Sequence, residues 1–321
     1  MYNRFCLLLF ALMSYVSLWA REGDTIALAD PTIFVDKGVY YLYGTSSNAD
    51  YAFEVYRSTN LKDWEGPVGK EQGYALKIGD SFGTTGFWAP QIFKYKGKYY
   101  MAYTANEQIA IAVSDSPMGP FSQEEKNIIP TGGRAIDPYV FFDTDGKIYL
   151  YHVRLTEGNR IFVAEMNDDL QSLKEETVHE CIAAQAKTWE DTADAGWKVA
   201  EGPTVLKEKG LYYLFYSAND YRNVDYAVGY AVSESPYGPW KRSGNSPIIS
   251  RDRLKESGTG HGDVFYDRKG RMKYVFHTHC SEGKVHPRKT AVIQLEKERV
   301  SKKEIRFNIL PETFLYLESS N

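Results

Sequence analysis

Three acidic residues stand at or beside the same place in a repeated phrase of this chain. Asp30 and Asp137 each precede a proline, and Glu201 stands two residues before one. A single aspartate before proline is usually a turn-forming residue. Carboxyl groups at matching places of a repeat can instead act together, one accepting a proton from water while another donates one. The spacing of these residues therefore points first to general acid and base chemistry.

The phrase occurs five times, and each copy is followed by a hairpin glycine and a Tyr-rich apolar run. Aligned on their second position, the copies lie 59, 48, 65 and 59 residues apart. A period of this size, built from strands and tight turns, is typical of a β-propeller. The sequence predicts an all-β chain folded as a five-bladed β-propeller. The copies begin at Asp30, Ala89, Asp137, Glu201 and His261.

A propeller places the equivalent positions of its blades around one axis. We therefore expect Asp30, Asp137 and Glu201 to converge at one end of the central channel. Hydrolysis of a glycosidic bond with inversion needs a carboxylate and a carboxylic acid about 6.5–9.5 Å apart, with room for a water molecule. A third carboxylate nearby raises the pKa of the acid by like-charge repulsion, or orients it by a hydrogen bond.

Composition agrees with one catalytic unit acting on an uncharged polymer. The repeat covers about residues 26 to 310, so residues 21–321 are expected to form a single propeller domain. The net charge is −4 and no basic cluster stands out, which disfavours nucleic acid and anionic membranes as partners. A neutral polysaccharide needs no charge complementarity.

Residues 1–20 have the pattern of a secretory signal peptide, with Arg4 as their one charge, an apolar stretch and Ala20 before the expected cleavage site. Cys6 precedes the apolar stretch, whereas a lipoprotein cysteine would follow it, so no membrane anchor is expected. The protein is predicted to be secreted, into the periplasm or the medium. Cys181 and Cys280 remain after cleavage, and two thiols in a chain of this size are expected to be unpaired.

The repeated phrases resemble those of glycoside hydrolase family 43, a family of inverting five-bladed propeller enzymes that act on arabinose- and xylose-containing polysaccharides. The resemblance covers almost all of the chain after residue 20. It implies that Asp30 is the general base, that Glu201 is the general acid, and that Asp137 tunes the pKa of the acid and orients it. The phrases that carry it are 29–33, 88–92, 136–140 and 200–203.

The resemblance extends to residues outside the carboxyl triad. It implies that His261 faces a structural calcium ion on the propeller axis, held directly or through water, although calcium prefers oxygen ligands. The alternative is a histidine that only forms hydrogen bonds in the channel. Arg288 resembles an arginine that reaches the site near the base, and the carboxylate chemistry itself requires no cofactor. Trp88 could form a flat wall for a sugar ring, or pack between blades.

Other aromatic and histidine residues are assigned to structure or to the rim. Trp64, Phe121 and Trp240 close equivalent turns and are predicted to pack between blades. His277 and His279 alternate along a strand without a third metal ligand, so both are taken as structural. The longest departure from the repeat, residues 181–200, is expected at the rim of the site because long loops in compact domains are often functional.

The first functional hypothesis is a secreted, exo-acting α-L-arabinofuranosidase working on arabinose- or xylose-containing polysaccharides or oligosaccharides. A β-xylosidase and an endo-acting arabinanase or xylanase are alternatives of the same class. A sugar-binding propeller without catalytic activity is the alternative of another class, and it would usually have lost one of the three carboxylates. The sucrose- and fructan-cleaving propellers are disfavoured because residues 28–32 lack their Asn-Asp-Pro-Asn phrase.

Overall fold

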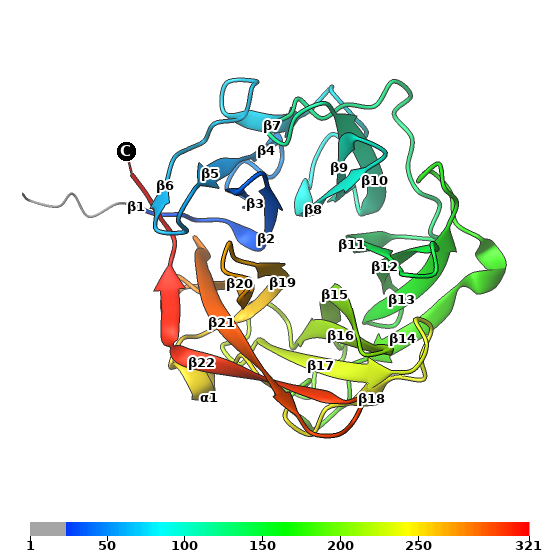
Figure 1. The fold of residues 1–321 in the computed structure, drawn as a ribbon, viewed down its shortest axis with the longest axis vertical. Helices are drawn as coiled ribbons and strands as arrows, with labels where there is room; N and C mark the ends of the chain where they lie inside the picture. Colours follow the sequence, from blue (N-terminus) through cyan, green and yellow to red (C-terminus); the bar gives the residue numbers. More distant parts are fainter. Residues whose placement is uncertain (1–23, 321) are drawn as a thin grey trace, which may run out of the picture.

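The computed structural model describes residues 24–320 and shows five antiparallel sheets set around a central axis (Figure 1). The predicted five-bladed β-propeller is confirmed. Each blade begins beside the axis with a strand that carries one copy of the repeated phrase. These inner strands are β2 (Ala29–Asp36), β8 (Trp88–Tyr95), β11 (Ala135–Phe142), β15 (Ala200–Glu208) and β19 (Gly260–Tyr266).

Hairpins lead outward from each inner strand. The second strands are β3 (Val39–Thr45), β9 (Lys98–Ala105), β12 (Ile148–Leu155), β16 (Leu211–Ala218) and β20 (Met272–Thr278). The third strands are β5 (Tyr56–Ser58), β10 (Gln108–Ser114), β13 (Asn159–Met166), β17 (Ala227–Ser233) and β21 (Lys289–Arg299). Fourth strands complete the last three blades, namely β14 (His179–Ala183), β18 (Lys241–Arg242) and β22 (Ile305–Tyr316).

A small extra sheet and two short helical turns lie outside the blades. The extra sheet pairs β4 (Ala52–Glu54) with β7 (Tyr74–Lys77). The helical turns are the 3-10 turn η1 (Glu175–Thr177) and α1 (Arg251–Leu254). No helix in the described part of the chain is long and apolar enough to cross a membrane.

The ring is closed by strands from both ends of the chain. β23 (Glu318–Ser319) lies between β1 (Asp24–Thr25) and β6 (Asp63–Trp64), and it runs parallel to β6. Figure 1 shows the C-terminal segment beside β1 and β6 of the first blade. These pairings tie the end of the chain to the outer edge of the first blade.

The hydrophobic core lies between neighbouring blades, which explains the near-continuous apolar runs of the second strands. All eight residues of β16 are buried. Trp64 and Phe121 are fully buried, and Trp240 is half-buried with its ring centroid 6.4 Å from that of Tyr151. These three side chains have the packing role predicted for them.

The rim loop is shorter than the departure from the repeat in the sequence. Residues 181–183 are the end of β14, so the long rim loop begins only after Ala183 and runs to Val199. Cys181 and Cys280 are both free, as expected. The predicted signal peptide, residues 1–20, lies outside the described residues.

Candidate active site

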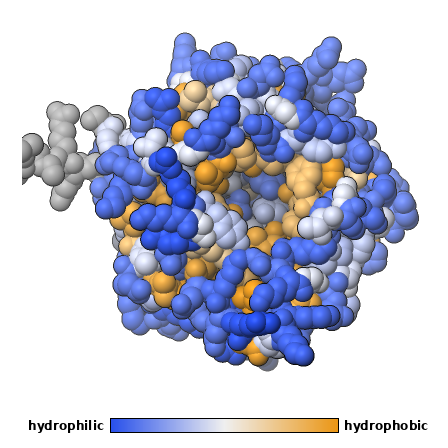
Figure 2. All heavy atoms as spheres, in the orientation of Figure 1, coloured by the Kyte–Doolittle hydropathy of each residue, from blue (hydrophilic) through white to orange (hydrophobic). Residues whose placement is uncertain are grey.

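A cavity of about 800 Å³ opens at one end of the propeller axis. Figure 2 shows it as a hollow at the centre of this face. The cavity is lined by every residue that the sequence singled out for catalysis or substrate binding, together with His261. Convergence of the three carboxyl groups is therefore observed, and it follows from the inner strands that carry them. The predicted residues are Asp30, Trp88, Asp137, Glu201, His261 and Arg288.

The same backbone irregularity in all five inner strands aims these side chains at the cavity, except that of Arg288, which directly precedes the third strand β21. The pairing of each inner strand with its second strand is interrupted by a β-bulge at the repeated phrase. One residue of each bulge has left-handed backbone geometry, a conformation that is costly for side chains other than glycine. These residues are Asp30 (φ 49°), Ala89 (46°), Asp137 (56°), Gly202 (60°) and His261 (43°).

Glu201 does not occupy the same position of the repeat as Asp30 and Asp137, because it directly precedes the bulge residue of its blade. The bulge residue of the fourth blade is Gly202, and an added Cβ there would lie 2.8 Å from the His261 ring. Only glycine fits beside His261 at this place. Glu201 instead pairs with Ser217, in the register where the second blade has Trp88 paired with Thr104.

Backbone N–H groups at the bulges are capped by side chains of the preceding blade. Thr45 Oγ1 accepts from Ala89 (3.0 Å) and Thr104 Oγ1 accepts from Asp137 (2.9 Å). Ser217 Oγ accepts in the same way from His261 at 2.8 Å. At the closure of the ring, His277 Nδ1 accepts from the N–H of Asp30 at 3.1 Å. These hydrogen bonds satisfy buried donors and hold each bulge in place.

The third blade has no such cap because Val153 occupies the equivalent position, opposite Ile136. Here the N–H of Gly202 donates to Asp137 Oδ2 at 3.1 Å. Asp137 thus replaces the missing hydroxyl and is tied directly to the residue that follows Glu201. This contact is one through which Asp137 would orient Glu201, and that role stays a prediction.

Asp30 lies among cations and donors. Arg288 Nη1 donates to its Oδ1 at 3.2 Å, and Thr45 Oγ1 donates to its Oδ2 at 2.7 Å. Burial opposes ionisation, but Arg288, His261, His277 and the Thr45 hydrogen bond together lower the pKa of Asp30 below its usual value. Asp30 is therefore a carboxylate at any ordinary pH, as a general base must be.

Glu201 has the opposite environment. Burial, opposed by hydrogen bonds from Tyr226 and Asn159 and reinforced by the charges of Asp30 and Asp220, raises the pKa of Glu201 to about 7. The hydroxyl of Tyr226 donates to Glu201 Oε1 and Nδ2 of Asn159 donates to Oε2, both at 2.8 Å. Near neutral pH this carboxyl group can hold a proton and release it.

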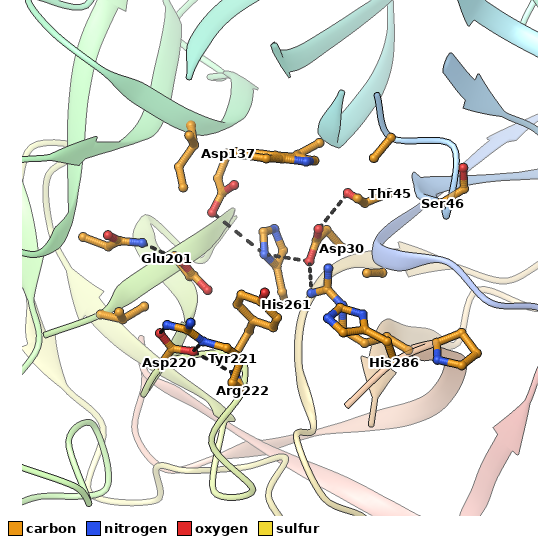
Figure 3. Close-up of a pocket in the computed structure, with 18 of the residues that line it drawn as sticks. Asp30, Thr45, Ser46, Asp137, Glu201, Asp220, Tyr221, Arg222, His261 and His286 are labelled. Atoms are coloured by element: carbon orange, nitrogen blue, oxygen red, sulfur yellow. Dashed lines mark hydrogen bonds and ion pairs between the residues drawn. The ribbon is translucent and has the colours of Figure 1, made fainter. Parts of the chain in front are cut away.

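Asp137 completes the triad. Burial, with the charges of Glu201 and Asp30, raises the pKa of Asp137 well above its usual value. Asp137 and Glu201 therefore resist being ionised together, and the pair retains a proton while Asp30 is charged. Figure 3 shows Asp30 and Glu201 on opposite sides of His261, which is the arrangement needed for one group to act on each face of a sugar.

His261 lies at the bottom of the cavity, with Nδ1 3.3 Å from Asp30 Oδ1 and 3.8 Å from Asp137 Oδ2. Burial lowers its pKa, against the attraction of Asp30. Below it, Asp263 already accepts hydrogen bonds from Thr32 (2.7 Å) and Thr204 (3.3 Å).

The groups around His261 do not fit a directly coordinated calcium ion. Within residues 24–320, no group of three or more His, Cys, Asp or Glu side chains could hold a metal, and calcium requires several oxygen ligands. A calcium ion held through water stays a prediction.

Arg288 and Trp88 both reach the cavity. The Arg288 guanidinium lies 4.7 Å from the centroid of the Tyr221 ring, and its buried Nε has no hydrogen-bond partner among the described residues. Trp88 is partly exposed at the cavity. Its ring packs against Gly86, where an added Cβ would lie 3.2 Å from the indole.

Several residues of the site were not predicted. Thr45, Asn159 and Tyr226 bind the carboxyl groups directly, and His277, assigned to structure, holds the backbone of Asp30 while its ring stacks on that of Tyr226 with centroids 5.7 Å apart. A signal for part of this set exists, because Thr45, Thr104, Ser217 and His277 all stand near the end of the second strand of a blade.

A further group lines the mouth of the cavity without any repeat signal, because it comes from loops that differ between blades. It consists of Trp197, Asp220, Tyr221, Arg222 and His286. Of these, Trp197 lies in the segment 181–200 that the sequence placed at the rim of the site.

Comparison with known proteins agrees with this geometry. Residues 25–297 match the model of glycosyl hydrolases family 43. The chain is 30% identical to xylosidase/arabinosidase 43A of Humicola insolens, over 84% of this chain and 94% of the relative. It is 27% identical to the extracellular endo-α-(1→5)-L-arabinanase 1 of Bacillus subtilis, over 75% and 76%.

A solved structure with a similar fold is that of an endo-1,4-β-xylanase from Bacteroides thetaiotaomicron, with a TM-score of 0.84 and 40% identity. It covers 94% of this chain and 99% of that one. The chain therefore belongs to family 43 of the glycosyl hydrolases, enzymes that hydrolyse glycosidic bonds with inversion.

Proposed function

We propose that the protein is an exo-acting α-L-arabinofuranosidase whose single propeller removes terminal arabinose from arabinose- or xylose-containing polysaccharides. The observation that carries the proposal is the contrast between Asp30 and Glu201 in one cavity. Arg288 keeps Asp30 ionised, whereas burial raises the pKa of Glu201 to about 7. Asp30 and Glu201 thus stand on opposite sides of His261 in one cavity, as a base and an acid would (Figure 3).

In this proposal Asp30 takes a proton from a water molecule, whose oxygen attacks the anomeric carbon. Glu201 gives its proton to the departing glycosidic oxygen, so the bond breaks as the new one forms on the opposite face. Tyr226 and Asn159 then stabilise the Glu201 carboxylate that results, because both donate to it. Asp137 orients the backbone next to Glu201 through its hydrogen bond with Gly202. Its charge would disfavour ionisation of Glu201.

Exo action is supported by the wall beside Asp30. Arg288 stacks on Tyr221, and the rings of Tyr221 and His286 meet edge to face with centroids 6.0 Å apart. The carbonyl of Tyr221 is bound by His279 Nε2 at 2.7 Å. This layered group lines the cavity beside Asp30, where the sugar to be released would lie. In the proposal it limits the space beyond that sugar, which favours a chain end over a chain that runs past.

A β-xylosidase is the second candidate, because the Humicola insolens relative is named for both activities. Arabinofuranose and xylopyranose can present hydroxyl groups to the same side chains. The sugar-binding propeller without activity is disfavoured, because all three carboxyl groups are present and line one cavity.

Hydrolysis of p-nitrophenyl α-L-arabinofuranoside and β-D-xylopyranoside tests the proposal. Release of one sugar by the wild type is expected to disappear in Asp30→Asn, which leaves no base. Glu201→Gln should lower kcat on a disaccharide by about 10²- to 10⁴-fold. Its effect on the nitrophenyl substrates should be smaller, because nitrophenol departs without a proton. Full activity of Asp30→Asn would contradict the assignment of the base.

Export is part of the proposal. It is supported by the signal-like pattern of residues 1–20 and by the name of the Bacillus subtilis relative. The mass of the mature protein, expected to begin at Arg21, checks it.

A further inference from the structure

Trp197 is an exposed aromatic residue at the mouth of the cavity that has no part in the core. It is 47% exposed, whereas Trp64 is fully buried. Its indole Nε1 donates to Asn159 Oδ1 at 2.8 Å. The polar edge of the indole is thus satisfied inside the protein, while much of the remaining ring surface is left to solvent. Exposed apolar surface at a cavity mouth often marks a binding surface.

The loop that carries Trp197, residues 184–199, is fixed by buried charges. Glu190 is 1% exposed and accepts from Arg242 Nε at 2.6 Å and from the hydroxyl of Tyr216. Asp191 is 3% exposed and its Oδ1 accepts from the N–H of Ala195 at 2.9 Å. The indole is therefore held in place before any ligand arrives, which lowers the entropic cost of binding.

Two contacts join the end of this loop to β13. The N–H of Asn159 donates to the carbonyl of Lys198 at 2.8 Å. A Cβ on Gly158 would come within 2.6 Å of the same carbonyl, so the two segments are in close contact. The backbone on either side of the Trp197–Asn159 hydrogen bond is thus anchored.

Asn159 connects Trp197 to the proposed acid. One end of its amide accepts from Trp197, and the other donates to Glu201 Oε2 at 2.8 Å. An acid must touch the oxygen of the bond that breaks, so the sugar that keeps this oxygen lies on the side of Glu201. Asp30 and Arg288 form the opposite side, where the released sugar would lie.

We propose that Trp197 is the platform of a leaving-group subsite, on which the uncharged pentose that keeps the glycosidic oxygen stacks its apolar face. This inference rests on the proposed function and extends it to the second sugar of the substrate. Stacking fixes that sugar next to Glu201, and Asn159 keeps the indole and the carboxyl group in one arrangement. Substrates with a sugar as leaving group should therefore gain rate from Trp197, and substrates without one should not.

The test compares disaccharides with glycosyl fluorides, which have no ring in the leaving group. Wild type, Trp197→Ala and Trp197→Phe are assayed on α-1,5-arabinobiose and β-1,4-xylobiose, and on α-L-arabinofuranosyl and β-D-xylopyranosyl fluoride. Trp197→Ala should lose about tenfold or more in kcat/KM on the disaccharide that is cleaved. It should keep the wild-type value on the matching fluoride.

Trp197→Phe separates stacking from positioning, because phenylalanine keeps an aromatic face but cannot donate to Asn159. It is expected to recover most of the loss. Tyr266→Ala, which removes another exposed aromatic ring (41% exposed) away from the cavity, should match wild type. Thermal unfolding of each variant shows that the fold is retained.

The outcomes are distinguishable. If wild type cleaves a disaccharide and its fluoride but Trp197→Ala slows both equally, the subsite is refuted and the proposed function stands. A phenylalanine variant as slow as the alanine variant also refutes stacking. If wild type cleaves neither kind of substrate, the proposed exo activity itself fails.

Discussion

At the scale of single residues, the site divides its work by giving two carboxyl groups different neighbours. Both are buried, and burial alone would raise the pKa of each. Asp30 is set apart by a guanidinium group at 3.2 Å. Glu201 receives only neutral donors, the Tyr226 hydroxyl and the Asn159 amide, and it faces the negative charges of Asp30 and Asp220.

This contrast predicts the pH dependence of kcat/KM on a disaccharide. Activity should fall as pH rises through about 7, because Glu201 loses the proton that the leaving oxygen needs. Tyr226→Phe removes a donor to the carboxylate, so the pKa should rise and the alkaline limb should move to higher pH. Asp220→Asn removes a negative charge, so this limb should move to lower pH. Shifts of both variants in one direction would contradict the assignment of Glu201 as the acid.

At the scale of the elements, all five blades share a β-bulge in the inner strand. Each bulge lies at the repeated phrase, and a side chain of the preceding blade accepts from the N–H of the bulge residue. In the fourth blade this acceptor is Asp137 itself. The left-handed backbone at Asp30 and Asp137 costs on the order of 1–3 kcal/mol each and persists because the surroundings fix it. The placement of Asp30 and Asp137 in the cavity therefore depends on acceptor atoms of other side chains, His277 and Thr104.

Thr104 tests this dependence. It is fully buried, and its hydroxyl accepts from the N–H of Asp137 at 2.9 Å. Thr104→Val keeps the shape but leaves that donor unpaired, which should lower the free energy of unfolding by about 1–3 kcal/mol and reduce kcat as Asp137 moves. Denaturant unfolding and kcat are measured together, with Thr104→Ser as the control that keeps the hydroxyl. Equal behaviour of the two variants would mean that the cap is unimportant.

The repeated features of the structure can be predicted from the sequence, whereas features that differ between blades cannot. The five phrases give the propeller and bring the three carboxyl groups to one end of the axis. The caps of the bulges give no motif in the sequence, because Thr, Ser and His share only an acceptor atom. The fourth bulge breaks even this pattern, since Val153 has no acceptor and Asp137 binds Gly202 instead. Trp197 and Asp220 lie on loops of irregular length, where nothing in the repeat gives their direction.

At the scale of the whole molecule, the proposed base lies at the seam where the ring closes. Asp30 belongs to the first blade, whereas His277 and Arg288, which bind its backbone and its carboxylate, belong to the last. Thr290 joins the two blades by exchanging hydrogen bonds with the backbone of Leu28 at 3.1 and 2.9 Å. The environment of the base is thus complete only when the ring is closed.

Leu317 lies in this seam. It is 1% exposed, its N–H donates to the carbonyl of Thr290 at 3.0 Å, and its own carbonyl accepts from Ile26 at 2.8 Å. Leu317→Ala should lower the free energy of unfolding by about 2–5 kcal/mol. Leu150→Ala, in the fully buried core of the third blade, is the matched control and should have a cost in the same range.

The two variants should differ in how activity is lost on heating. A weakened seam can open locally before the ring unfolds, because regions with fewer supporting contacts open at lower free energy. Such opening would separate Arg288 and His277 from Asp30. Leu317→Ala should therefore lose activity below its own unfolding midpoint, whereas Leu150→Ala should lose activity and structure together. Coincidence of the two transitions in both variants would show that the propeller opens as a single unit and that the seam has no separate control over the base.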